Sequence, residues 1–516
     1  MSVVLLMYLF AMLVIFPLYY YDHYLNMAFH KWDFFMMATL SMGLLLCIGW
    51  VVLKVRALGH CHNAKTTKKR KLSSADGFAA AYFFSSVITY ILCPDGRAAW
   101  MGVDGWYMGI VTQVTLLFVY VVCSGICVKE QWIYVFGCAG CTITAVIAIL
   151  QRVGCDVLHL YYGMEAEVVR DYLSTIGNRT WFSGYYCAVF PIIIYPFLRT
   201  EDKRIRIASG GFWALGSTCL LMSYSDSAMA VMAVLLFVVG VTSFRGEKEI
   251  KRYLELIVVM IGAWSVMALV YHLFFDNMRV ARGISKMLLD LRVILPLLLL
   301  TSAGYIRVVL MGKAGKCLCS QDNMRKWRIG LWTAALTGGA LLILFIVLNT
   351  GGILEKYFGV TVCNPYLFFD DKWGDNRGFA WEITLRMYGE LPMVYKLFGV
   401  GQDCFAWYAY NKEPYGAILR EAWGGAILTN AHNEWLNSLL CSGIFGFISY
   451  VGIFCSVIYE YIRRLNRNEE DNIVQGIGLC VIAYMTHNFF CYQQIAAAAP
   501  IFILIGIASG KSRDIK

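Results

Sequence analysis

Long apolar runs recur along the whole of this 516-residue chain. Many of them are roughly 20 residues long, the length that a helix needs to cross the hydrocarbon core of a bilayer. The composition agrees, since 59% of the residues are hydrophobic and 15% are charged, whereas soluble proteins carry about a quarter charged residues. These features exclude a cytosolic enzyme, a secreted disulfide-stabilised domain and a disordered chain. They predict an all-α polytopic membrane protein.

The apolar runs predict about 14 transmembrane helices and one large external loop that contains short helices. The predicted spans cover residues 3–20, 33–53, 76–93, 106–127, 132–150, 183–198, 207–222, 227–243, 254–274, 291–309, 328–348, 437–459, 472–490 and 496–510. We divide the chain into N-terminal helices (1–150), central helices with an external loop at 151–182 (151–348), the large loop (349–436) and C-terminal helices (437–516).

The positions of the basic residues predict the orientation. With the N-terminus in the cytoplasm, 28 of the 44 Lys and Arg residues fall in the short cytoplasmic segments, including the KKRK run at Lys68–Lys71. An excess of Lys and Arg in short loops marks the cytoplasmic side. Both termini are therefore expected in the cytoplasm. The net charge of +10 is explained by this asymmetry, and no nucleic-acid partner is predicted.

The large external loop is the segment most suggestive of function, because long ordered loops in membrane proteins usually have a task. It contains five of the 15 tryptophans, together with many tyrosines and mixed charges. Aromatic faces next to hydrogen-bonding groups suit carbohydrate, while a belt of aromatic residues at the membrane interface is the alternative. Asn376–Glu390 has helical spacing. Cys363 and Cys404 lie in the same loop, where a disulfide between them is one option.

His432 stands at the outer end of a predicted span. On a continuous helix, Gly443 and Gly446 would lie near the same face, where small residues allow a neighbouring helix to approach closely. A lone interfacial histidine is more often a satisfied polar residue than a catalyst. Its neighbours therefore decide how it is interpreted.

The spacing His432-Asn433, nine residues, then Gly443-Ile444-Phe445-Gly446 resembles the signature of the O-antigen ligases, a family that includes the Wzy-type polymerases of surface polysaccharides. Further similarity lies in Asn178–Gly184 (NRTWFSG), in Arg377–Trp381 with Leu397–Gly401 and Phe405, and in His487-Asn488. The resemblance covers roughly residues 170–450. Asp226, in Ser223–Ala228, stands where a basic residue is frequent, and fourteen spans exceed the twelve typical of the ligases.

The resemblance implies a membrane glycosyltransferase of the bacterial inner (cytoplasmic) membrane. It would move a glycan from a polyprenyl (undecaprenyl) pyrophosphate donor to an acceptor hydroxyl of a glycan, glycolipid or protein, with inversion and without a metal or other cofactor. Arg179 and Arg377 would bind the pyrophosphate, because planar guanidinium binds phosphate oxygens bidentately. His432 would be the general base, since an imidazole of pKa near 6.5 can accept a hydroxyl proton. Asn433, Gly443, Gly446 and His487 would support the site.

Two alternatives stay open at this point. A ligase and a polymerase differ in the acceptor, which the sequence does not identify. A transporter or flippase for lipid-linked oligosaccharide would also have many spans, but such proteins usually place ionisable residues inside the bilayer. Here the predicted spans contain almost no charges, and the notable polar residues gather at one face. We therefore expect the enzyme.

Overall fold

The computed structural model describes residues 1–59, 71–274, 280–314 and 320–513. Most of the KKRK run lies outside these residues, so its position is not described. The N-terminal helices are α1 (Ser2–Phe10), η1 (Ala11–Ile15), α2 (Phe16–Leu18), α3 (Met27–Gly59), α4 (Ser74–Leu92), α5 (Gly96–Met101), α6 (Ile110–Gly125) and α7 (Glu130–Arg152).

The central part contains α8 (Ala166–Val169), α9 (Arg179–Val189), η2 (Phe190–Ile193), α10 (Ile194–Arg199), α11 (Lys203–Met222), α12 (Asp226–Ser243), α13 (Glu247–Leu273), α14 (Gly283–Leu288), α15 (Leu291–Lys313) and α16 (Gln321–Thr350). Two short antiparallel strands, β1 (Tyr172–Leu173) and β2 (Gly177–Asn178), lie before α9. The last part consists of α22 (Glu434–Asn466), α23 (Asn472–His487) and α24 (Ile495–Arg513).

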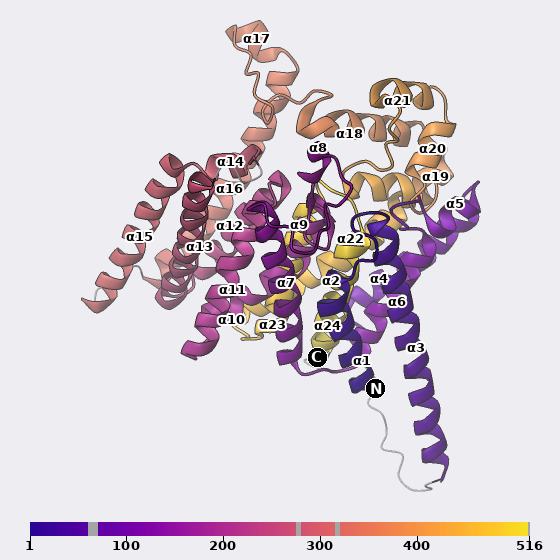
Figure 1. The fold of residues 1–516 in the computed structure, drawn as a ribbon, viewed down its shortest axis with the longest axis horizontal. Coiled ribbons are helices and arrows are strands. Elements are labelled where there is room, and N and C mark those ends of the chain that lie inside the picture. The colour runs from indigo at the N-terminus through magenta and orange to yellow at the C-terminus, as the bar shows by residue number, and fades with distance from the viewer. Residues whose placement is uncertain (60–70, 275–279, 315–319, 514–516) are drawn as a thin grey trace.

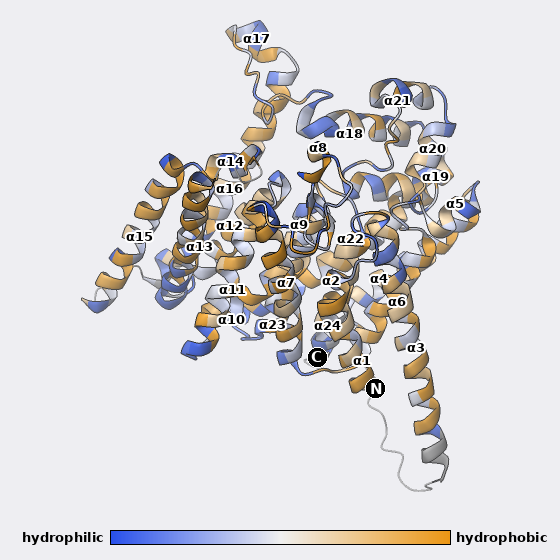
Figure 2. Cartoon of the chain, viewed as in Figure 1, coloured by the Kyte–Doolittle hydropathy of each residue, from blue (hydrophilic) through white to orange (hydrophobic). Residues whose placement is uncertain are grey.

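The helix bundle has the character of a membrane protein. Among the described residues, eleven helices are long and apolar enough to cross a bilayer. Each of the fourteen predicted spans overlaps a helix, but Ser2–Leu18, α6 and α23 are shorter than the other eleven. Figure 2 shows apolar residues along the helices and hydrophilic residues gathered at both ends of the bundle. The expected all-α, multi-pass architecture is therefore confirmed.

Burial separates the inner helices from the outer ones. In the run from Arg179 to Arg199, 94% of the most apolar window is buried, and in α24 the share is 78%. In α16 the corresponding window is entirely unburied, and its exposed leucines and isoleucines suit contact with lipid. Figure 1 shows α13, α15 and α16 at one edge of the molecule and α9, α22 and α24 near its centre.

The large loop folds over one end of the bundle, at the opposite end from the two termini (Figure 1). Its helices are α17 (Ile353–Phe358), α18 (Trp373–Glu390), α19 (Met393–Phe398), α20 (Phe405–Asn411) and α21 (Tyr415–Trp423). Helix α18 contains the predicted helix at Asn376–Glu390, although its regular part begins only after Asn376, because Gly374, Asp375 and Asn376 all have positive φ. Buried residues of the loop form a second apolar core with the ends of α4 and α22.

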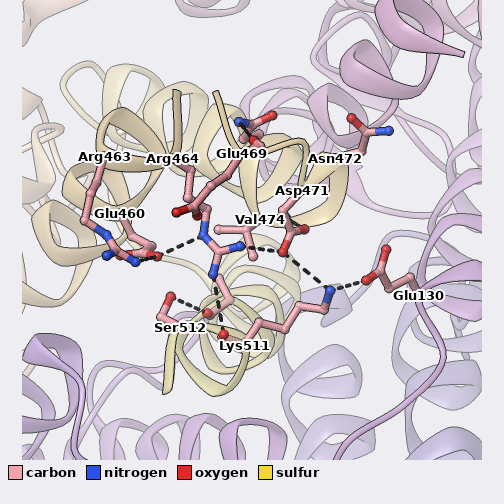
Figure 3. Close-up of polar contacts among 12 residues, drawn as sticks. Glu130, Glu460, Arg463, Arg464, Glu469, Asp471, Asn472, Val474, Lys511 and Ser512 are labelled. Atoms are coloured by element: carbon pink, nitrogen blue, oxygen red, sulfur yellow. Dashed lines mark hydrogen bonds and ion pairs between the residues drawn. The ribbon is translucent and has the colours of Figure 1, made fainter. Parts of the chain in front are cut away.

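Ion pairs join four helix ends at the end of the bundle away from the loop (Figure 3). Arg464 near the end of α22 is 1% exposed, and it donates to Glu460 at 2.8 Å and to Asp471 of α23 at 2.6 Å. Lys511 of α24 pairs with Asp471 at 3.6 Å and also with Glu130 at the start of α7. In this cluster the buried Arg464 is thus balanced by two carboxylates, as burial of a charge requires.

Candidate active site

His432 lies between the large loop and the first turn of α22. Its backbone has φ +48°, and its N–H donates to the side-chain oxygen of Asn430 at 2.9 Å. The imidazole is half-buried and meets the ring of Tyr492 edge-on, with 5.5 Å between the ring centroids. Burial, followed by the positive charge of Arg377, lowers the pKa of His432 to about 4. The ring is therefore neutral at pH 7 and can accept a proton.

Arg377 is the basic group whose charge acts on this imidazole. The regular part of α18 begins at Arg377, after the three residues with positive φ. Its Nε donates to the carbonyl oxygen of Phe490 at 2.8 Å, and its Nη1 donates to that of Gly374. These two bonds fix the direction of the guanidinium, so that an anion would have to use the remaining N–H groups.

Arg179 is the first residue of α9 and is already engaged with protein groups. Its Nε lies 3.3 Å from a carboxylate oxygen of Asp171, and its Nη1 donates to the carbonyl of Tyr224 at 3.1 Å. Trp181, two residues further on, donates its indole N–H to the hydroxyl of Tyr492 at 3.1 Å. The first turn of α9 and His432 thus contact the same tyrosine, although Arg179 itself contacts neither of the other two predicted catalytic side chains.

Asn433 does not touch the imidazole of His432 through any hydrogen bond that the described residues show. Its side-chain oxygen accepts from the backbone N–H groups of Trp435 and Leu436 at 3.0 and 3.2 Å. Asparagine at this position caps the helix N-terminus, where backbone donors have no partner within the helix. Asn433 is 3% exposed. In the structure Asn433 therefore caps α22 directly after His432.

The two glycines of the motif do not lie on one helix face against the same neighbouring helix. Gly443 interrupts α22 with φ +65°, and a Cβ atom there would lie 2.4 Å from the backbone of Leu397 and Phe398. The prediction of a continuous helix was wrong here. The interruption leaves the carbonyl groups of Leu440 and Cys441 free to accept hydrogen bonds from outside the helix. These accept from Val400 and Gly401 of the loop, each at 3.1 Å.

Gly446 fits the expected close approach of a neighbouring helix. A Cβ atom added at this glycine would lie 3.3 Å from the hydroxyl oxygen of Ser85 in α4, and α4 packs along α22. Gly443 therefore admits the loop, whereas Gly446 admits a helix.

His487 is fully buried at the end of α23 and lies beneath the site. Its Nε2 is 2.9 Å from the hydroxyl of Ser183 in α9 and 3.7 Å from the thiol of Cys491. Ser183 in turn lies 3.4 Å from the hydroxyl of Ser225, which bonds Ser227 at 2.8 Å. This polar cluster joins α9, α12 and the end of α23. Through Cys491, His487 also contacts the segment that carries Tyr492.

Residues 488–494 connect the predicted site residues, a role that was not predicted from the sequence. The carbonyl of Asn488 accepts from the N–H of Glu434 at 2.9 Å, and the N–H of Gln493 donates to the Glu434 carboxylate at 2.7 Å. The same segment supplies the carbonyl that Arg377 contacts and the Tyr492 ring beside His432. The predicted span 472–490 includes residues 488–490, whereas α23 ends at His487 and the loop begins there. Asn488 and the pair Gln493-Gln494 are the polar residues that mark this loop in the sequence.

A small polar cavity lies beside Tyr492, between the loop and the bundle. Its lining includes the carboxyl groups of Asp403 and Glu434 and the amides of Gln113 and Gln493. Burial raises the pKa of Asp403 to about 7, although the N–H groups of Val103 and Met108 donate to its carboxylate at 2.9 and 3.1 Å. Asp403 thereby fastens the large loop to the segment between α5 and α6.

Asp226 also has a structural partner in the large loop. Its carboxylate accepts from the N–H of Ile284 at 3.0 Å and from the hydroxyl of Tyr366 at 3.1 Å. These bonds give a reason for an acidic residue at a position where the resembling family often has a basic one.

No family model matches the chain, and no curated protein matches it. Within the described ranges, no group of three His, Cys, Asp or Glu side chains is arranged to hold a metal ion. The structure thus defines an all-α, multi-pass membrane protein in which His432 and Arg377 both contact residues 490–492, where the large loop meets the bundle.

Proposed function

We propose that this protein is a membrane glycosyltransferase of the O-antigen ligase or surface-polysaccharide polymerase type. It transfers a glycan from a polyprenyl pyrophosphate to an acceptor hydroxyl, with inversion and without a metal. The observation that carries the proposal is that His432 packs against the ring of Tyr492 while Arg377 donates to the carbonyl of Phe490, so that both side chains contact the same short segment. This displacement needs a base for the acceptor proton and a fixed cation for the leaving group, and these two residues would supply them.

The roles follow from the atoms that change partners. His432 removes the proton from the acceptor hydroxyl as its oxygen attacks the anomeric carbon of the donor sugar. The new C–O bond forms while the bond between that carbon and the pyrophosphate oxygen breaks, and the pyrophosphate leaves with the electron pair. Arg377 stabilises the negative charge that develops on the leaving group. Attack from the opposite side inverts the configuration.

An aromatic surface beside Arg377 supports binding of a lipid-linked sugar. The rings of Trp373 and Trp381 lie 5.1 Å apart between centroids, and Trp381 lies 5.5 Å from Phe489. Phe489 is 46% exposed. Aromatic faces pack against the apolar C–H faces of sugars and against isoprenoid chains, while tryptophan prefers the membrane interface. The donor would then lie with its pyrophosphate at Arg377 and its chain along the bundle.

We also assign Arg179 to the pyrophosphate, although in the structure its guanidinium is engaged with Asp171 and Tyr224. To bind phosphate it must share or exchange its contact with Asp171, whose side chain is 35% exposed. An anionic donor offers more negative oxygen atoms than this carboxylate, so an exchange is favourable when the donor is bound. The proposal therefore includes Arg179 in the donor complex.

The proposed setting is the bacterial inner membrane, with fourteen crossings, both termini in the cytoplasm and the large loop outside. This orientation follows from the excess of basic residues in the short segments on the side of the termini. The acceptor is a second lipid-linked repeat unit in a polymerase, or a finished glycolipid or protein in a ligase. Bilayer lipid is the other partner, and no nucleic acid is involved.

The decisive experiment on the class of activity uses the purified protein in vesicles with a polyprenyl-pyrophosphate glycan and candidate acceptors. A new glycosidic bond, identified by mass spectrometry together with released polyprenyl pyrophosphate, is the expected product. The transporter or flippase alternative predicts another result, in which the donor crosses the bilayer chemically unchanged. Crossing without bond formation with every acceptor tried would reject the enzyme.

A further inference from the structure

Two cysteine thiols far apart in the sequence meet at the base of the large loop. The Sγ atoms of Cys93 and Cys404 lie 3.9 Å apart, although 311 positions separate the residues. Cys93 caps the C-terminal end of α4, and Cys404 caps the N-terminal end of α20. Both residues are buried, with exposed fractions of 9% and 0%. Two helix ends thus present their thiols to each other.

Gly401 provides the space in which the two sulfur atoms meet. It has φ +129°, a conformation that favours glycine. A Cβ atom at this position would lie 2.6 Å from the sulfur of Cys93 and 2.8 Å from that of Cys404. Any side chain at residue 401 would therefore collide with both sulfur atoms. The backbone turn and the pair of thiols are compatible only because this residue is a glycine.

Cys404 is placed differently from what its loop position suggested. A disulfide with Cys363 was one option, but Cys363 is exposed while Cys404 is fully buried against Cys93. A disulfide requires an S–S distance of about 2.05 Å. The two sulfur atoms must therefore approach by roughly 2 Å for the bond to form.

We propose that Cys93 and Cys404 form a disulfide bond in the mature protein. The oxidant is a dithiol–disulfide carrier on the outer side of the membrane, where the large loop lies in the orientation proposed above. One cysteine thiolate attacks the carrier disulfide and expels one carrier thiol, and the other cysteine then attacks the mixed disulfide. The two cysteines lose two electrons and two protons, and the carrier is released as a dithiol.

The disulfide fastens the loop to α4 at a point that noncovalent contacts already organise. Asp403, next to Cys404, accepts two backbone N–H groups from residues 103 and 108. Val400 and Gly401 bond to α22 on the other side. Because the thiols are buried in the folded protein, the mixed disulfide with the carrier forms before the loop has docked, and docking then brings the second cysteine to it. The finished bond is then shielded from reductants.

Mass spectrometry of the unmutated full chain tests the proposal. Intact cells with a functioning disulfide-forming system are treated with N-ethylmaleimide, and the protein is then denatured in the same reagent and digested. We expect a cross-linked peptide pair that contains Cys93 and Cys404. Neither residue should carry the reagent unless a reductant is added before alkylation. Detection of both residues in alkylated form without reductant would overturn the proposal, as would a cross-link from Cys404 to Cys363 or Cys441.

Serine variants provide a matched comparison. Cys93→Ser should leave Cys404 open to alkylation after denaturation, and Cys404→Ser should do the same for Cys93. Cys441→Ser is the control, because Cys441 is a buried cysteine of the same apolar core whose loss should leave the 93–404 cross-link unchanged. This readout does not require activity, so failure of the proposed enzyme function would leave the disulfide result standing.

Discussion

At the scale of single residues, the environment of His432 changes the pH dependence that a free imidazole would give. Sequence alone predicts an activity limb near pH 6–7, the ordinary range of histidine. Burial and the charge of Arg377 lower the pKa of His432 to about 4. The proton-accepting form therefore persists to much lower pH in the free enzyme.

We accordingly predict that kcat/KM stays level from neutral pH down to about pH 5 and falls below it, because kcat/KM reports ionisations of the free enzyme. Bound pyrophosphate adds negative charge near the ring, which favours the protonated form, so the limb in kcat should lie at higher pH. Rates of glycan transfer, measured at a series of pH values and donor concentrations, give both kcat/KM and kcat. A kcat/KM limb centred at about pH 6–7 would contradict the lowered pKa of this half-buried ring.

We expect the substitution Arg377→Lys to impair glycan transfer. Lysine keeps the charge but loses the planar fork and the Nε–H that bonds Phe490. Loss of a hydrogen bond to a charged group is worth about 1.5–3 kcal/mol, so Arg377→Lys should reduce kcat/KM by about 10- to 100-fold. Arg386→Lys is the control on the same helix, since Arg386 is exposed and pairs with Glu382 one turn away. Equal activities of the two variants would remove Arg377 from the donor site.

At the scale of elements, the break in α22 decides how the loop meets the bundle. Gly443→Ala places a side chain at φ +65° and against the backbone of residues 397–399. Backbone strain of this kind costs about 1–3 kcal/mol, so we expect a lower thermal midpoint and easier proteolysis of the loop. Gly339→Ala in α16 is the control, because no atom lies within 4 Å of its added Cβ. A Gly443→Ala variant as stable as this control would show that the break is dispensable.

The helices themselves could be predicted from the sequence, because apolar runs of sufficient length form helices in a bilayer irrespective of their neighbours. The break at Gly443 could not, because it depends on the backbone of the loop that packs there. For the same reason the contacts of Tyr492, and the meeting of Cys93 with Cys404, were not foreseen. Residues from α9, the large loop and the segment after α23 converge only once the whole chain is folded.

At the scale of the whole molecule, the large loop and the termini lie at opposite ends of the bundle (Figure 1). We predict that single cysteines placed in the exposed residues 355–361 react with a membrane-impermeant maleimide added to intact cells, whereas one at Lys203, at the start of α11, reacts only after permeabilisation. The background lacks the native reactive thiols. Labelling of both positions from the same side would contradict the orientation.

The central claim is that His432 accepts the proton in glycosidic bond formation, and one measurement tests it most directly. His432→Ala and the unmutated protein are compared for single-turnover glycan transfer in vesicles at equal donor occupancy. His159→Ala is the matched control, because His159 is an exposed histidine outside the bundle with a similar backbone, φ +51°. Loss of a general base costs about 10²–10⁴-fold in rate, so His432→Ala should lose at least that lower bound while still binding donor. Transfer by His432→Ala at the rate of the His159→Ala control would contradict a role for His432 as the base.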